Sequence, residues 1–212
     1  LRSDELDING SVEFTSSDAR LTSVGTFVPD FSGITKPQKA VLTLAMGELH
    51  NSYVFWLYPQ TDVEITENGI KTADDELIFA DSVEKAKVLI ASGKKAMVIT
   101  DGSNAIENAY CADFWNYHMF RVISESMNKP VAPGTMGLLI DKNDKLFSAF
   151  PCEKFTTPQW YEAVMHSKAD ILDDTPDVTP IVQVVDNTER CHRLGMLYKR
   201  NGILHCSIRL WE

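Results

Sequence analysis

Apolar and polar residues alternate over the first fifty positions, where short apolar runs are separated by Gly, Pro, Asp and Ser. Val12 and Phe14, for example, lie between polar neighbours, which is typical of a half-buried strand. The pattern predicts strands over residues 11–15, 25–28 and 40–44. These strands are too few to close a sandwich, so we interpret residues 1–50 as a β-rich N-terminal segment attached to a second domain.

From residue 51 onward, runs typical of strands alternate with runs typical of helices. The predicted strands are short apolar runs bounded by turn residues: 53–58 (buried on both faces), 76–80, 95–100, 136–140 (a strand or a buried turn), 181–185, 194–200 and 203–210. The predicted helices have a capping residue or an apolar stripe: 83–91, 114–126 and 157–166. Alternating units of this kind favour an α/β domain over residues 51–212, with a mostly parallel sheet flanked by helices and an antiparallel edge.

The four residues Cys191-His192 and His205-Cys206 are of the types that bind zinc. However, Asn201-Gly202 lies between two apolar-rich runs and predicts a hairpin with a type I′ turn. That turn sets three cross-strand pairs: Arg200 with Ile203, Tyr198 with His205, and Leu197 with Cys206. Neighbouring residues on a strand point to opposite faces, so the four side chains cannot converge. We predict no metal site and a core position for Cys206.

The chain has 212 residues, of which 20 are basic and 30 are acidic, and its net charge is −10. This charge repels phosphate backbones and no basic stripe offsets it, so we expect no nucleic-acid partner. No apolar run approaches the roughly 20 residues that span a bilayer, so we expect no membrane span. A complete (β/α)₈ barrel takes about 250 residues, more than this chain has. The sequence starts at Leu1 without a Met, and we expect it to be a piece of a larger protein.

Acidic residues are concentrated in two segments, 62–84 and 170–177. Charge runs of this kind usually form solvated surfaces, so we interpret both segments as exposed loops. A calcium site is the alternative, but neither segment has the Asp-x-Asp-x-Asp-Gly pattern with its terminal Glu.

The turn after the predicted strand 95–100 is where a fold of this class would carry a nucleophile. It reads Asp101-Gly102-Ser103-Asn104-Ala105, whereas a nucleophile elbow requires Gly-x-Ser/Cys-x-Gly. Cys111 lies eight residues further on, and no His has a sequence companion that singles it out for a triad. Glycine-rich phosphate loops are absent as well. We therefore predict no catalytic residue and no cofactor.

The richest polar group follows the predicted strand 181–185. Asp186, Asn187 and Arg190 lie there, and Trp160 lies in the helix that Pro158 opens. Planar polar groups and an aromatic face are what sugar recognition uses, so these four are candidate carbohydrate-binding residues. The alternative, which we favour, is a strand-end turn held by Asp/Asn side-chain hydrogen bonds and an Arg–Asp pair, with the tryptophan in the core.

Six stretches carry a resemblance to a known group: Asn51–Pro59, Phe114–Phe120, Met136–Asp141, Phe150–Tyr161, Pro180–Tyr198 and Gly202–Leu210. The most specific part is Pro-Ile-Val-Gln-Val-x-Asp-Asn, followed by Arg-Leu-Gly. These stretches resemble the C-terminal region of large bacterial family 2 glycoside hydrolases of the β-galactosidase type. In that group a flavodoxin-like domain, related to class I glutamine amidotransferases and ThuA-like proteins, follows the sugar-cleaving barrel.

The resemblance implies a non-catalytic accessory domain of a carbohydrate-active protein, with a structural or assembly role. Its partners would be the catalytic and β-sandwich domains of a parent glycosidase, or other copies of itself. Two alternatives remain open: a carbohydrate-binding module, and a free-standing ThuA-like enzyme that acts on a sugar or small amide through Ser103 or Cys111. The resemblance also implies a periplasmic or extracellular location in a bacterium, with a cytoplasmic one as the alternative.

Overall fold

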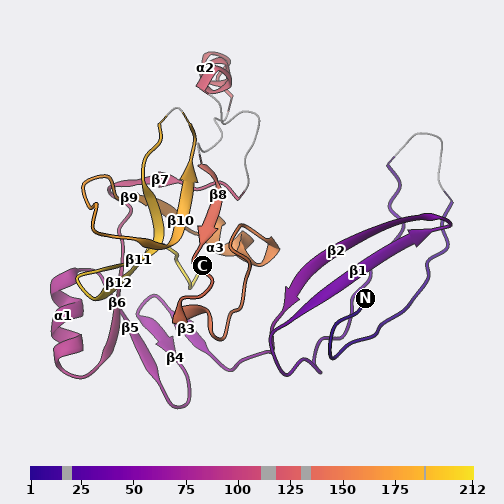
Figure 1. Ribbon diagram of the computed structural model, residues 1–212, viewed down its shortest axis with the longest axis horizontal. Coiled ribbons are helices and arrows are strands. Elements are labelled where there is room, and N and C mark those ends of the chain that lie inside the picture. Colours follow the sequence, from indigo (N-terminus) through magenta and orange to yellow (C-terminus); the bar gives the residue numbers. More distant parts are fainter. Residues whose placement is uncertain (16–20, 111–117, 130–134, 189) are drawn as a thin grey trace. The chain divides into compact units, whose positions relative to one another are not determined.

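Two units make up the chain in the computed structural model, Leu1–Thr61 and Asp62–Glu212 (Figure 1). The structure describes residues 1–15, 21–110, 118–129, 135–188 and 190–212. The sequence predicted a boundary at residue 50, a position that lies inside a strand of the first unit. None of the described helices combines the length and the apolar character that crossing a membrane requires.

The first unit is built on one antiparallel hairpin of β1 (Gln38–Met46) and β2 (Leu49–Leu57). At its open end a small core forms, in which Ile34, Ala40 and Leu57 are buried. Gln38 is buried beside this core, and its Oε1 accepts a hydrogen bond of 2.9 Å from the backbone N–H of Glu5. The N-terminal residues are thereby attached to the open end of the hairpin.

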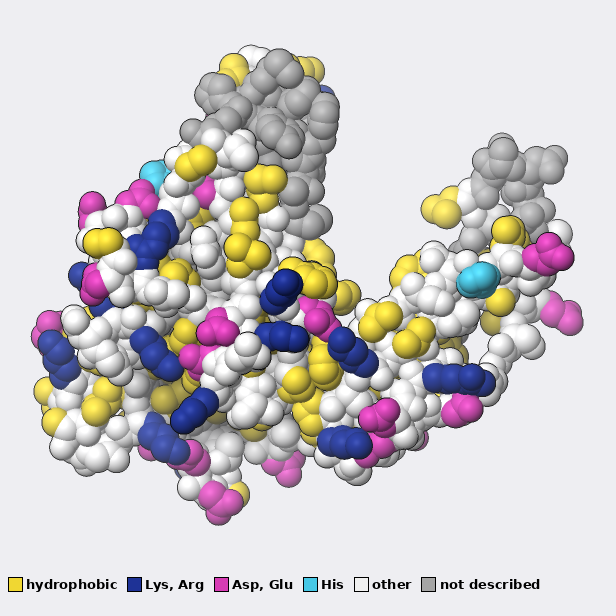
Figure 2. All heavy atoms as spheres, viewed as in Figure 1, with side chains coloured by type: hydrophobic (Ala, Val, Ile, Leu, Met, Phe, Trp, Pro, Cys, Tyr) yellow, Lys and Arg dark blue, Asp and Glu magenta, His cyan; other side chains and the backbone are white. Residues whose placement is uncertain are grey.

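The turn end of this hairpin is exposed. Leu44, Met46, Leu49 and Tyr53 are all at least half exposed, and apolar side chains are visible on the surface of this unit in Figure 2. The prediction of a strand over residues 53–58 was correct, but its burial on both faces was wrong. Tyr53 and Val54 are exposed, and among the described residues β2 pairs with β1 alone. Residues 11–15 and 25–28 were predicted as strands and form none.

The second unit contains a ten-stranded sheet and short helices. The strands are β3 (Glu64–Thr66), β4 (Gly69–Lys71), β5 (Glu76–Ala80), β6 (Lys95–Ile99), β7 (Ala105–Glu107), β8 (Thr135–Ile140), β9 (Lys168–Ile171), β10 (Pro180–Asp186), β11 (Leu194–Arg200) and β12 (Ile203–Cys206). The helices are α1 (Val83–Ala91), α2 (His118–Ser126) and α3 (Tyr161–Met165), with 3₁₀ turns at Lys145–Phe147 and Pro158–Trp160. The main strand order is β3-β4-β5-β6-β12-β11-β10-β8, while β9 pairs with both β11 and β7.

The predicted fold class, a mostly parallel flavodoxin-like sheet flanked by helices, was wrong. Only the pairs β5–β6 and β6–β12 are parallel, and every other described pair is antiparallel. A parallel pair that is adjacent in the chain needs a long crossover, and only α1 provides one, between β5 and β6. Most other strands follow one another through turns or irregular segments, which allow antiparallel pairing.

The β5-α1-β6 unit matches the sequence prediction closely. Ser82 is the N-cap of α1, and its hydroxyl accepts a hydrogen bond from the backbone N–H of Lys85, which satisfies one of the free donors of the first turn. The helix packs through Ala86 against Ala80 and Val98 of the two parallel strands. This unit is the part of the second domain that has α/β character.

The C-terminal hairpin of β11 and β12 also has the predicted register. Arg200 pairs with Ile203 and Tyr198 with His205. Asn201 and Gly202 have φ values of 51° and 77°, and a positive φ at both central residues defines the predicted type I′ turn. The short β12 is thus inserted between β11 and β6, which makes it an interior strand.

One large apolar core lies within the second unit. Leu194, Met196 and Val182 are completely buried there. Trp160 joins the same core, with its ring edge-on to those of Phe147 and Phe150 at centroid distances of 5.9 and 5.5 Å.

Candidate functional site

The carboxyl ends of the parallel strands are the best-defined polar region of the second unit. Ligands of sheets with parallel strands usually bind there. β6 ends at Ile99, and the next residue, Thr100, donates its backbone N–H to the carbonyl of Cys206 at the end of β12 (2.9 Å). Two cavities open at this edge, and both include Thr100 and Asp101 in their lining.

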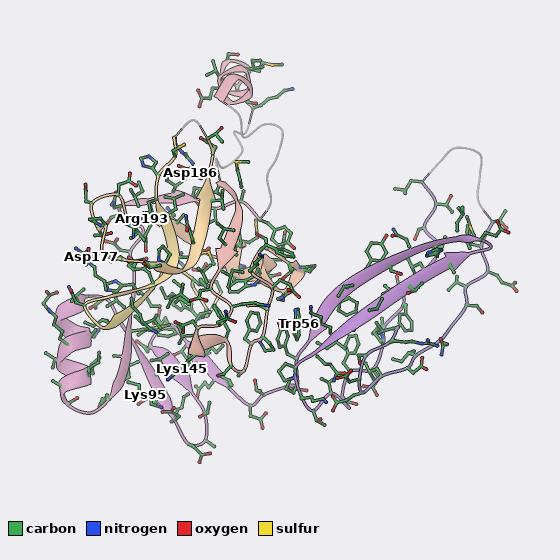
Figure 3. All side chains as sticks on the ribbon, in the orientation of Figure 1. Trp56, Lys95, Lys145, Asp177, Asp186 and Arg193 are labelled. Carbon is green, nitrogen blue, oxygen red and sulfur yellow. The ribbon has the colours of Figure 1, made fainter. Side chains whose placement is uncertain are left out.

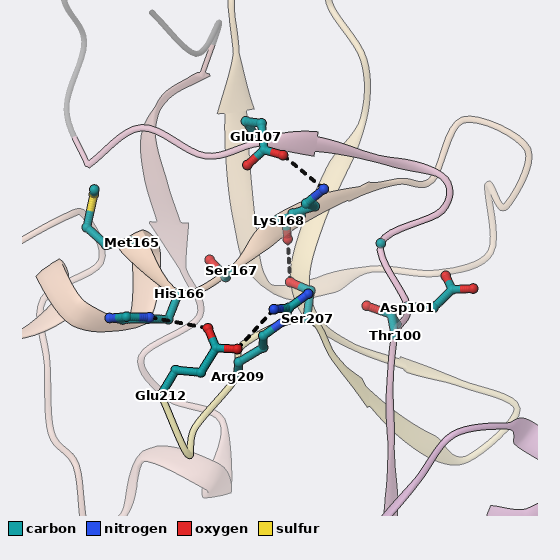
Figure 4. A pocket seen from close by; sticks show the side chains of 11 residues that line it. Thr100, Asp101, Glu107, Met165, His166, Ser167, Lys168, Ser207, Arg209 and Glu212 are labelled. Atoms are coloured by element: carbon teal, nitrogen blue, oxygen red, sulfur yellow. Dashed lines mark hydrogen bonds and ion pairs between the residues drawn. The ribbon is translucent and has the colours of Figure 1, made fainter. Parts of the chain in front are cut away.

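The smaller cavity has a volume of about 150 Å³ and is shown in Figure 4. Its basic side chains are paired with carboxylates. Lys168 Nζ lies 2.9 Å from Glu107 Oε1, and Arg209 Nη1 lies 2.9 Å from Glu212 Oε1. His166 Nδ1 lies 3.5 Å from the other oxygen of Glu212. The basic groups of this cavity therefore already have carboxylate partners within the protein.

The larger cavity has a volume of about 320 Å³, which is within the lower range of small-molecule sites. Its lining is mostly polar: Thr100, Asp101, Ser103, Asn104, Asp170, Asp174, Thr175, Tyr198 and Arg200, together with Ile171 and Leu172. These residues come from the loop after β6, from β9 and the loop after it, and from the C-terminal half of β11.

Asp170 is the central polar group of this cavity. It lies on β9, and only 6% of its surface is exposed. Oδ1 accepts a hydrogen bond from Thr100 Oγ1 and Oδ2 accepts one from Tyr198 Oη, both at 3.2 Å. Burial raises the pKa of Asp170 to about 6, against the opposing effect of the two hydrogen bonds. The negative charge of Asp101 raises it further.

Tyr198 connects this carboxyl group to the interior of the hairpin. Burial raises the pKa of Tyr198 well above its usual range, and the Asp170 charge acts in the same direction, so the phenol remains a hydrogen-bond donor. Its ring stacks on that of His205 across the strand pair, with centroids 5.0 Å apart and planes within 11°. Burial lowers the pKa of His205, so this imidazole is neutral at neutral pH.

The predicted candidates Asp186 (labelled in Figure 3), Asn187 and Arg190 lie together in the turn after β10. The Asp186 side chain is 1% exposed and accepts hydrogen bonds from Asn187 N (2.8 Å), His192 N (3.0 Å) and the Arg190 guanidinium. Asn187 Oδ1 accepts one from Arg190 N at 2.9 Å. These contacts are those of the alternative that we favoured, a turn held by Asp/Asn bonds and an Arg–Asp pair.

Trp160 lies apart from that turn. Its side chain is buried in the core against Phe147 and Phe150, so it offers no exposed face to a sugar ring. The structure therefore brings three of the four candidate residues together and leaves the fourth in the core.

The residues considered for nucleophilic catalysis have no activating partner in the described structure. Ser103 lines the larger cavity, and its N–H donates to Asp101 Oδ1 at 2.9 Å. Hydroxyl groups of the cavities donate to carboxylates or backbone carbonyls, for example Thr100 to Asp170 and Ser207 to the carbonyl of Lys168, and none donates to a histidine. Cys111 lies outside the described residues.

The four residues considered for zinc do not form a metal-binding group. Cys206 is buried, and burial raises the pKa of its thiol to about 11. Cys191 is exposed in the turn after β10, where its thiol faces the carbonyl of Thr188 at 3.0 Å. Across the described ranges, no three His, Cys, Asp or Glu side chains are arranged to hold a metal ion.

Sequence reasoning missed the two central residues of the larger cavity. Asp170 begins the acidic segment 170–177, which was interpreted as an exposed loop, yet it is buried within β9. The run Lys168-Ala169-Asp170-Ile171 is short and carries one apolar face, so its strand character was hidden by the acidic residues that follow. Tyr198 was placed correctly on its strand and opposite His205, but its hydrogen bond to Asp170 was not predicted, because β9 was not predicted.

Comparison with known proteins gives one family. Residues 77–210 match the family described as a domain of unknown function, DUF8487, and no curated protein matches the chain. The matched region extends from β5 past the end of β12 and contains every residue that lines the larger cavity. Because it covers well over half of the 212 residues, the chain belongs to this domain family, DUF8487.

Proposed function

We propose that the second unit is a binding domain for a small hydroxyl-bearing molecule, of which a saccharide is the leading class, and that the larger cavity is its site. The observation that carries this proposal is the buried carboxyl group of Asp170 at the wall of a 320 Å³ cavity. A buried carboxylate is costly unless it makes strong hydrogen bonds, and within the described part of the chain two neutral hydroxyls are its side-chain donors.

The other groups in the lining fit a ligand with several hydroxyls. Carboxylates accept hydrogen bonds and the Arg200 guanidinium donates them. The oxygens of Asn104 and Thr175 can accept, while an amide N–H of Asn104 and the Thr175 hydroxyl already donate to backbone carbonyls. Such a mixed set matches sugar hydroxyls, which are donors and acceptors at once. This site replaces the turn at Asp186, whose polar groups already satisfy one another.

Titration calorimetry with a panel of mono- and oligosaccharides tests the proposal. We expect measurable binding that Tyr198→Phe and Asp170→Asn each weaken by about tenfold, the loss typical of one good hydrogen bond. Asp144→Asn is the matched control, because Asp144 instead caps the 3₁₀ turn at Lys145. Absence of heat across the panel, or equal affinities in all four proteins, would refute the proposal.

An accessory role within a carbohydrate-active protein remains our proposal from the sequence resemblance, as does an extracytoplasmic location. The exposed apolar side chains at the turn end of the β1–β2 hairpin support a role in assembly, because a lone two-stranded hairpin is marginally stable in water. Light scattering of the purified chain tests self-association, and we expect Leu49→Lys to reduce any dimer. The ThuA-like alternative depended on a parallel sheet of a kind that this chain does not have, and we do not pursue it.

A further inference from the structure

The larger cavity differs from its surroundings in how its charges are paired. Asp101, Asp170 and Asp174 line it, and none of them takes part in an ion pair among the described residues. Arg200 is the one basic residue in the lining, and it is likewise absent from those ion pairs. The cavity wall therefore carries three acidic groups against one basic group.

Some carboxylates outside the lining of this cavity are already paired with basic groups. Asp173 Oδ2 lies 2.6 Å from His192 Nδ1, and Asp186 binds the Arg190 guanidinium. In the smaller cavity, Glu107 and Glu212 have basic partners too. Asp101, Asp170 and Asp174 therefore give the wall of the larger cavity more negative than positive charge, which favours a ligand with a cationic group.

A bare metal ion does not suit this arrangement. A divalent cation requires several oxygen ligands that converge within about 2 to 2.6 Å of one point, and the described residues contain no such group of acidic side chains. An ammonium group is better matched, because its three donors reach separate acceptors. Asn104 Nδ2 donates to the carbonyl of Ile171 and the Thr175 hydroxyl donates to the carbonyl of Leu172, so the oxygens of these side chains remain as acceptors for the uncharged part of the same molecule.

We propose that the ligand of the larger cavity is a small polyol that carries a positively charged amine, such as an amino sugar or an amino alditol. This inference rests on the proposed function and specifies the charge of its ligand. Asp174 and Asp101 are exposed and bind the ammonium at the rim, while Asp170 is the buried acceptor. Because the pKa of Asp170 is about 6, affinity falls as the pH is lowered through that value and the carboxylate is neutralised.

Three matched six-carbon chains test the inference by calorimetry: glucamine (cationic), sorbitol (neutral) and gluconate (anionic). At about pH 7.5 we expect glucamine to bind at least about tenfold more tightly than sorbitol, the gain that one ion pair near a surface would give. We expect gluconate to bind most weakly, because the carboxylates of the cavity repel it. Lowering the pH to about 5 should weaken glucamine by a clearly larger factor than sorbitol, because protonation of Asp170 removes a charge interaction from glucamine as well as weakening a hydrogen bond to either ligand.

Asp174→Asn and Asp101→Asn should each reduce the preference for glucamine over sorbitol without loss of folding, because both side chains are exposed. Circular dichroism of each variant verifies the fold. If sorbitol or gluconate binds as tightly as glucamine, the charge inference fails and the binding function stands. If no member of this set and no saccharide of the wider panel binds, both proposals fail.

Discussion

The Asp170→Asn variant should become more stable relative to wild type as the pH rises. The reason is that ionising the buried carboxyl group of Asp170 costs free energy in the folded wild type. The pKa of Asp170 is about 6 in the folded chain and 3.8 in the absence of its surroundings. Between these two values the folded state holds a proton that the unfolded state has released, so wild-type stability falls as the pH increases through this window. The decrease in wild-type stability is complete above about pH 6, and there is no decrease below the pKa of the unfolded state.

The size of this effect follows from the two pKa values. At 1.36 kcal/mol per unit, the contribution of Asp170 to the free energy of unfolding falls by roughly 2 kcal/mol between about pH 4.5 and pH 7.5. Asn has no charge but keeps an oxygen that can accept from Thr100 or Tyr198. If its NH₂ group lacks a hydrogen-bond acceptor, the resulting cost does not depend on pH. The stability of Asp170→Asn relative to wild type should therefore rise by roughly 2 kcal/mol over this range, equivalent to about 4–8 °C in Tm.

Urea unfolding of both proteins at several pH values measures this difference, and subtraction cancels the contributions of the other carboxylates. Asp144→Asn is the control of opposite sign, because backbone N–H donation from Leu146 lowers the pKa of Asp144. Its stability relative to wild type should not rise with pH. A constant or decreasing difference for Asp170→Asn would show that this carboxyl group is not ionised at a cost, and would refute the reasoning.

Three further substitutions test other parts of the structure by thermal or urea unfolding. Trp160→Ala should cost about 3–5 kcal/mol, because it empties a buried site between Phe147 and Phe150; an unchanged Tm would contradict the core position. Asp186→Ala should cost about 3 kcal/mol, since it leaves a guanidinium and two backbone N–H groups without their acceptor, whereas a loss below 0.5 kcal/mol, roughly that of a surface substitution, would contradict this. Gly202→Ala should cost about 1 kcal/mol from its φ of 77° alone, because a Cβ there meets no atom within 4 Å; Gly33→Ala, at ordinary φ, is the control and should be nearly neutral.

Local features of the fold followed from the sequence because their causes are local. The cap of α1, predicted at Asp81 or Ser82, and the Asn201-Gly202 turn depend on residues within a few positions. Ser82 is the cap, and the turn appears as predicted. This turn also fixes the pairing of Tyr198 with His205, because the loop of a hairpin sets the register of its two strands. These elements place one wall of the larger cavity.

The sheet topology was not predictable in the same way. The strands predicted at 76–80 and 95–100 are joined by a real crossover helix. Extending this pattern to the rest of the chain led to the wrong prediction of a mostly parallel sheet. The direction of β8, β9 and β10 is decided by partners far away in sequence. Asp170 became significant only when β9 was placed beside Thr100 and Tyr198, which lie 70 and 28 residues away.

The insertion of β12 between β6 and β11 has a consequence for the order of folding. His205 and Cys206 pair with Val98 and Ile99, more than a hundred positions earlier. The β5-α1-β6 unit can form as soon as it is synthesised, but one edge of β6 stays open until the last hairpin arrives. Such distant closure slows folding. On the ribosome, the free edge of β6 stays unpaired while roughly a hundred further residues are made, and a chaperone or a neighbouring chain has that interval in which to bind it.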